Sequence, residues 1–167
     1  MTIVNEQPVA LRGADLFWHV MSTFILQQAN TNPCSPVLPG EVRWDQGTWR
    51  DFVGKDRCGT AFCLAGYISD VCGGRWLVTL DEHGGLLVDG KPPRGSVLGA
   101  MDLLLAEPDD ILTSVRDGIT VTSAHNRAVR LLGLDGSYDL FAETNTYDDL
   151  VLLGTDLFGP PPAHIRI

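Results

Sequence analysis

The spacing of apolar residues along the chain predicts a series of short helices. From Phe17 to Phe24, apolar side chains recur at the three-, four- and seven-residue spacing of one helical face, which predicts a helix over residues 15–30. This helix should end before Pro33, because a residue that precedes proline avoids the α conformation. Residues 33–43 are rich in proline and predict an irregular connection.

A second helix is predicted over residues 61–72, which are almost all apolar. Thr60 is placed to cap its N-terminus, and Gly73 is a suitable C-terminal stop. A helix that is polar on no face is buried on most sides, so we expect this one to be central. Ala65 and Gly66 would let a neighbouring element approach it closely.

The remaining patterns predict one hairpin and several shorter elements. Residues 76–80 and 86–89 flank an Asp-Glu-His-Gly-Gly turn, which is typical of a β-hairpin. Capping residues, apolar spacing and proline stops predict four more helices. They span residues 96–106, residues 124–132 after the cap Ser123, residues 137–142, and a last segment that begins after Asn145 or Thr146 and carries Leu150, Leu153 and Leu157. Residues 119–121 predict a short extended piece.

These elements predict a mainly α fold of the α+β class. We expect a compact bundle of about five to six short helices around the buried helix, with one β-hairpin insertion. Residues 1–167 should form a single globular domain, with 1–12 and 160–167 as peripheral tails. Neither a membrane-spanning run nor a signal peptide is expected, so the predicted location is cytoplasmic.

The charge of the chain is acidic and unevenly distributed. The net charge is −9, of which −2 falls in residues 1–100 and −7 in residues 101–167. This balance argues against binding to nucleic acid, which requires clustered Lys and Arg. The acidic part could attract a basic partner or could simply be solvated. The candidate partner surface comprises Asp102, Glu107, Asp109, Asp110, Asp148 and Asp149.

The cysteines suggest two kinds of chemistry, each weighed against a structural role. Cys58 precedes a predicted helix N-terminus, which favours a thiolate, so a cysteine-dependent hydrolase with His125 as its base is one alternative. Cys58 and Cys63 lie near the spacing of zinc ligands, so a small zinc-binding domain is another. Free cysteine is by default a small buried hydrophobic residue. We therefore expect no catalytic set, no metal and no cofactor.

Two sequence motifs lie between residues 44 and 66. Residues 44–49 read Trp-Asp-Gln-Gly-Thr-Trp, and we expect Trp44 and Trp49 to pack onto the core, with 45–53 forming a short helical turn. Residues 58–66 read Cys-Gly-Thr-Ala-Phe-Cys-Leu-Ala-Gly. The predicted structural motif comprises Trp44, Trp49, Cys58, Gly59, Thr60, Cys63, Ala65 and Gly66.

With these motifs and the later stretches 128–134, 140–141 and 145–150, the chain resembles a group of small uncharacterised proteins of mycobacteriophages, other actinobacteriophages and their actinobacterial hosts. The resemblance covers most of the chain in the same order. The resemblance implies a phage setting and no mechanism. Together with the absence of a catalytic set and the acidic C-terminal part, it leads to the hypothesis of a non-enzymatic phage accessory protein that binds a host or phage protein in the bacterial cytoplasm. The sequence does not determine the oligomeric state, and a homodimer is one of the alternatives.

Overall fold

The chain adopts a mixed fold in which helices and small sheets occupy different parts of the molecule. The computed structural model describes residues 11–29, 41–53, 59–97, 99–136 and 139–166. Within these ranges it has four helices and eight strands, and the strands form three small sheets. The predicted bundle of helices with a single hairpin insertion is therefore wrong, and the fold is α+β.

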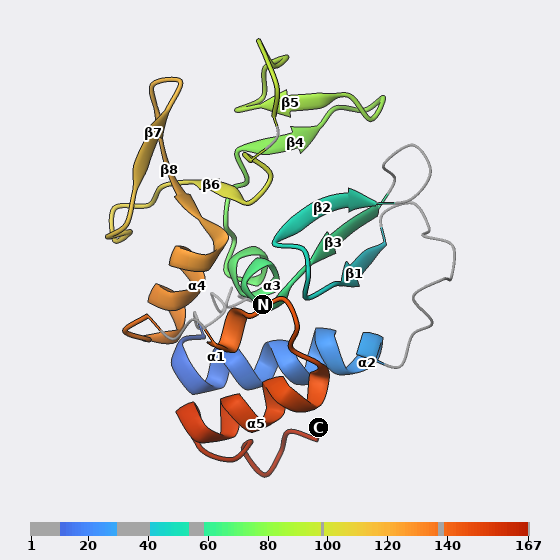
Figure 1. Ribbon diagram of the computed structural model, residues 1–167, viewed down its shortest axis with the longest axis vertical. Coiled ribbons are helices and arrows are strands. Elements are labelled where there is room, and N and C mark those ends of the chain that lie inside the picture. The colour runs from blue at the N-terminus through green and yellow to red at the C-terminus, as the bar shows by residue number, and fades with distance from the viewer. Residues whose placement is uncertain (1–10, 30–40, 54–58, 98, 137–138, 167) are drawn as a thin grey trace, which may run out of the picture.

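The helices gather in one half of the molecule, seen in the lower part of Figure 1. The first helix is continuous and changes from α1 (Gly13–Val20) through the π-helical η1 (Met21–Ile25) to α2 (Leu26–Ala29). It contacts the other three, which are α3 (Leu64–Val71), α4 (Ala124–Leu132) and α5 (Tyr147–Phe158). A short 3-10 turn, η3 (Asp139–Phe141), precedes α5.

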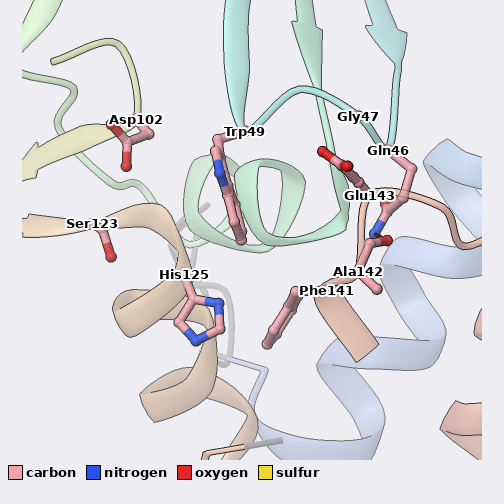
Figure 2. Close-up of a pocket in the computed structure, with 9 residues that line it drawn as sticks. All are labelled: Gln46, Gly47, Trp49, Asp102, Ser123, His125, Phe141, Ala142 and Glu143. Atoms are coloured by element: carbon pink, nitrogen blue, oxygen red, sulfur yellow. Dashed lines mark hydrogen bonds between the residues drawn. The ribbon is translucent and has the colours of Figure 1, made fainter. Parts of the chain in front are cut away.

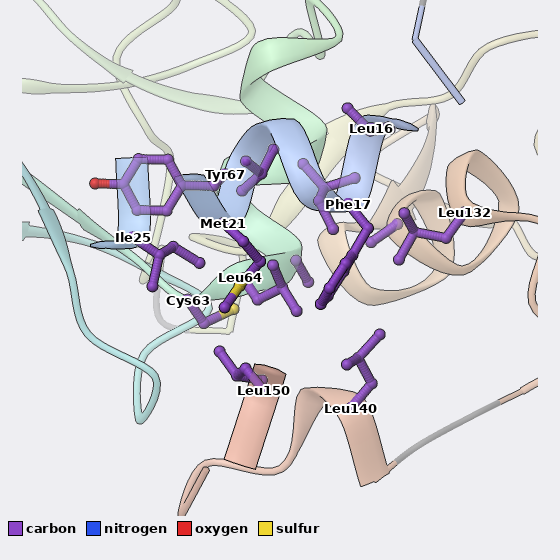
Figure 3. Packing of buried hydrophobic residues seen from close by; sticks show 14 of the residues in the cluster. Leu16, Phe17, Met21, Ile25, Cys63, Leu64, Tyr67, Leu132, Leu140 and Leu150 are labelled. Carbon is purple, nitrogen blue, oxygen red and sulfur yellow. The ribbon is translucent and has the colours of Figure 1, made fainter. Parts of the chain in front are cut away.

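The predicted buried helix is present as α3. Its residues from Leu64 to Ser69 are all buried, and they pack among side chains of the first helix and α4. Figure 3 shows this core, in which Phe17 and Met21 of the first helix face Leu64. Leu140 of η3 and Leu150 of α5 close the same cluster from the other side.

The first sheet includes residues of both sequence motifs and corrects two predictions. Its strands are β1 (Val42–Trp44), β2 (Arg50–Val53) and β3 (Gly59–Phe62), in the order β1-β3-β2. The expected helical turn over 45–53 is instead a tight turn followed by β2. Thr60 does not cap a helix: it lies within β3 and pairs with Val42 on one side and Phe52 on the other. The helix begins later, with Cys63 at its N-cap position.

Two further sheets lie beyond α3. The predicted hairpin is confirmed as the antiparallel pair β4 (Val78–Leu80) and β5 (Leu86–Val88). The third sheet has β6 (Leu103–Leu105), β7 (Ser114–Arg116) and β8 (Ile119–Ser123) in the order β6-β8-β7. The expected extended piece at 119–121 is thus part of β8. The expected helix over 96–106 is wrong, because its Leu103–Leu105 run pairs with β8.

Helix ends follow the local sequence closely in the C-terminal half. The Ser123 hydroxyl accepts a hydrogen bond from the Asn126 N–H at 3.1 Å, and Gly133 ends α4 in the left-handed conformation with φ 68°. Thr146 and Asp149 form a reciprocal capping box at the start of α5. Of the two predicted tails, residues 1–10 lie outside the described residues, and Ile165 of the C-terminal tail packs against the core.

Candidate functional site

A cleft of about 480 Å³ lies where three distant segments of the chain meet. The turn between β1 and β2 provides one wall, and the segment after η3 provides another. Asp102 and the junction of β8 with α4 provide the third (Figure 2). The lining residues are Gln46, Gly47, Trp49, Asp102, Ser123, His125, Phe141, Ala142 and Glu143. The cleft therefore combines aromatic, amide and carboxylate side chains.

Three aromatic rings define the apolar part of the cleft. The centroid of the His125 ring lies 5.5 Å from that of Trp49 and 5.0 Å from that of Phe141, both edge to face. Phe141 is buried, whereas Trp49 keeps 40% of its surface exposed. Trp49 therefore does not pack fully onto the core as predicted. Burial lowers the pKa of His125, so its imidazole is neutral at pH 7.

The backbone of Trp49 is held in place from beneath by α3. The Cys63 thiol donates to the Trp49 carbonyl oxygen at 3.8 Å, and the same oxygen lies against the backbone of Gly66. A side chain at position 66 would collide with that oxygen and with Phe62. Gly66 thus admits the close approach that the sequence predicted, and the approaching element is the Trp49 backbone.

Gln46 joins the cleft to the core through three hydrogen bonds. Its Oε1 accepts from the Leu64 N–H at 3.1 Å and from the Trp44 indole N–H at 3.2 Å, and its Nε2 donates to the Ala142 carbonyl at 3.3 Å. The side chain is only 8% exposed. Gln46 therefore supplies the acceptor at the N-terminus of α3 that was expected from Thr60.

The polar part of the cleft is acidic. Asp102 and Glu143 supply its carboxylates, and the described residues of its lining include neither Lys nor Arg. Burial raises the pKa of Asp102, although its own backbone N–H and the charge of Arg116 partly oppose this effect. The Ser123 hydroxyl is engaged as the cap of α4. The arrangement is suited to holding a positively charged group against aromatic rings.

The hydrolase and zinc hypotheses rest on Cys58 and Cys63, and of these two the structure describes Cys63. Cys58 lies outside the described residues, so its pairing with His125 stays a prediction. Cys63 is 1% exposed, and burial raises the pKa of its thiol to about 11 despite nearby backbone N–H groups. A protonated, buried thiol is not a nucleophile at neutral pH. Within the described part of the chain, no group of three His, Cys, Asp or Glu residues is placed to hold a metal.

Part of the predicted acidic partner surface is an internal ion cluster. The Arg127 guanidinium, 1% exposed, donates to Asp110 through Nε at 2.9 Å and Nη2 at 2.5 Å, and to Glu107 at 2.6 Å. Arg130 donates to Glu107 at 2.8 Å. The Asp110 side chain is 2% exposed and is therefore unavailable to a partner.

The other acidic residues of the predicted partner surface lie in different parts of the molecule. Asp109 is 86% exposed beside the ion cluster. Asp148 and Asp149 lie in the first turn of α5, where carboxylates interact favourably with the helix dipole. Only Asp102 of the predicted surface lies in the cleft. The expected acidic face is therefore three separate sites.

The sequence reasoning missed three residues of the cleft. Gln46 lies within the Trp-Asp-Gln motif, and its amide was a signal for a buried hydrogen-bonding role. Phe141 lies in the Leu-Phe pair of the family resemblance. Glu143 carried no local signal, because tertiary packing alone brings it to the same cavity as Asp102 and Trp49.

Comparisons with family models, with curated proteins and with solved structures gave no match. None of the described helices is both long and apolar enough to cross a membrane.

Proposed function

We propose that this chain is a non-enzymatic binding protein that engages a protein partner through the cleft around Trp49. The observation that carries the proposal is a large aromatic side chain, 40% exposed, beside a preformed cavity lined by polar groups. Exposed tryptophans at such positions are typical centres of protein–protein binding energy. The cavity volume also falls in the range of ligand sites, about 300–1,000 Å³.

The rigidity of the cleft supports the same proposal. The Trp49 backbone is held by Cys63 and Gly66, and His125 lies in the first turn of a capped helix. Gln46 connects the wall formed by the segment after η3 to α3. A site whose walls are held before binding loses little conformational entropy when a partner arrives.

The proposed partner is a host or phage protein in the bacterial cytoplasm. This part rests on the resemblance to phage and actinobacterial proteins. The hydrolase alternative depends on Cys58. Labelling with iodoacetamide against pH tests it, because a nucleophilic thiol titrates well below the ordinary pKa of about 8.5.

Affinity capture from a mycobacterial lysate tests the proposal when wild type is compared with matched variants. Trp49→Ala should reduce recovery of a specific partner by about 30-fold, the effect of losing a central aromatic contact of about 2 kcal/mol. Val115→Ala removes an apolar side chain that is 72% exposed on β7, outside the cleft, and should leave recovery unchanged. A partner that both variants capture as well as wild type would refute the use of this cleft, and circular dichroism verifies that each variant is folded.

A further inference from the structure

We infer that the cleft receives an arginine side chain of the partner, held between the aromatic rings and the two carboxylates. This inference rests on the proposed function, since it names what the partner presents to the same site. It follows from the charge of the lining, from the ring arrangement and from a guanidinium site that the chain already contains.

The charge of the cleft selects a cation. Asp102 and Glu143 are its two carboxylates, and neither Lys nor Arg is among the described residues that line it, although the charge of Arg116 reaches Asp102. The neutral His125 ring adds no positive charge at pH 7. The chain as a whole carries a net charge of −9. An approaching cation is therefore attracted at long range and meets carboxylates at short range.

The rings favour guanidinium over ammonium. His125 meets Trp49 and Phe141 edge to face, with ring centroids 5.5 and 5.0 Å apart, and of the two carbocyclic side chains Trp49 is the exposed one. A planar guanidinium can stack on the face of a single ring such as Trp49 while its N–H groups, which point outward in the plane, donate to carboxylates. An ammonium is a compact, strongly hydrated charge and loses more water on entering.

The chain shows the same chemistry at Arg50. Its guanidinium carbon lies 4.6 Å from the ring centroids of both Phe52 and Trp76, and its Nη1 donates to the Val78 carbonyl at 2.6 Å. That site is filled from within the chain. The cleft offers a comparable combination of rings and oxygen acceptors to a guanidinium from outside.

The state of Asp102 supports the inference. Burial raises the pKa of this carboxylate, which means that its charged form has lost hydration. A guanidinium in the cleft would replace that lost hydration with charged hydrogen bonds. Glu143 is exposed and lies on the opposite wall, so it can complete the contact without being desolvated first.

Blocked tripeptides provide a direct test in the full chain. The probes are acetyl-Gly-Arg-Gly-amide, its Lys counterpart and its citrulline counterpart, which keeps the shape of arginine without the charge. Binding is followed through the Trp49 indole N–H signal in nuclear magnetic resonance, assigned with Trp49→Phe. We expect saturable binding of the Arg peptide with a Kd of about 1–10 mM, and citrulline binding at least about tenfold weaker. Equal shifts with the Arg and citrulline peptides would overturn the inference, as would a Lys peptide that binds more tightly.

Charge-matched variants separate the cleft from general attraction. Asp102→Asn with Glu143→Gln should weaken Arg-peptide binding at least about tenfold. The control, Glu82→Gln with Asp148→Asn, changes the net charge equally at exposed positions outside the cleft, and should bind as wild type. Equal weakening in both pairs would reduce the effect to net charge and overturn the inference.

These experiments distinguish failure of the arginine inference from failure of the proposed function. Suppose that Trp49→Ala abolishes partner capture while Asp102→Asn with Glu143→Gln leaves it intact. The cleft is then the binding site but does not receive arginine. If the peptides bind as expected and Trp49→Ala leaves capture unchanged, the cleft binds guanidinium groups but the captured partner uses another surface.

Discussion

Gly66→Ala tests the packing that connects the buried helix to the candidate site. A Cβ at this position would lie 2.8 Å from Phe62 Cδ1 and 3.0 Å from Phe62 Cβ, and closer still to the Trp49 carbonyl oxygen. Neither obstacle is the far end of a flexible side chain. The backbone of Trp49 must therefore move, or α3 must shift within the core.

Two opposing effects set the magnitude. Overpacking of this kind costs about 1–3 kcal/mol, and the backbone contact places Gly66→Ala towards the upper end. Alanine in a helix is more favourable than glycine by up to about 1 kcal/mol. We expect a net decrease of about 1–2 kcal/mol in the free energy of unfolding, or a Tm lower by about 2–8 °C for a chain of this size.

Urea unfolding, followed by circular dichroism and tryptophan fluorescence, measures this change. Gly95→Ala is the matched control, because a Cβ there meets nothing within 4 Å and its φ is not in the left-handed region. The control should be unchanged or more stable by up to about 1 kcal/mol. If Gly66→Ala were stabilised as much as Gly95→Ala, the close approach of Trp49 to α3 would be refuted.

Four further predictions concern groups buried in the fold. Gln46→Leu should cost about 1–3 kcal/mol in urea unfolding, because the Leu64 N–H loses its acceptor, and an unchanged stability would contradict the capping role. Arg127→Met should cost about 1–3 kcal/mol, because the buried Asp110 carboxylate loses its two hydrogen bonds from Arg127 and keeps only Arg130 and the Glu107 N–H, whereas a neutral effect would show that Arg127 is dispensable. Burial would raise the pKa of Asp110, but hydrogen bonds from Arg127 and the Glu107 N–H leave this pKa below its ordinary value. The stabilising contribution of Asp110 is therefore complete above about pH 4 and disappears as the pH falls through the lowered pKa. The free energy of unfolding, measured against pH, should lose this dependence in Asp110→Asn. Cys63 should resist iodoacetamide at pH 8 in the native protein and react in urea, and mass spectrometry of native protein labelled at this position would disprove its burial.

Elements that depend on neighbouring residues were predictable from the sequence. The Ser123 cap, the Gly133 stop and the start of α5 near Thr146 each involve groups within a few positions of one another. The hairpin of β4 and β5 likewise closes through its own five-residue turn. The apolar composition of residues 61–72 was enough to indicate that α3 is buried, although its first turn begins later than expected.

Strand pairing and the cleft were decided by tertiary structure. A run such as Leu103–Leu105 is compatible with a buried helix or a strand, and only the availability of β8 as a partner makes it a strand. Gly59–Phe62 was similarly read as a helix start, yet it pairs with β1 and β2, which lie earlier in the chain. Gln46 caps α3 from 18 positions away, and Arg127 neutralises Asp110 from 17 positions away.

The sequence by itself therefore determined the two ends of α4, the start of α5, the hairpin turn, the burial of α3 and the acidic character of the chain, because each depends on composition or on short-range hydrogen bonds. Which acidic residues are exposed, which amide caps the central helix and which side chains meet around Trp49 were decided only when distant segments packed together. Long-range contacts carry no fixed spacing along a single chain, and for that reason the candidate site was invisible until the fold brought Trp49, Asp102, His125 and Glu143 to one cleft.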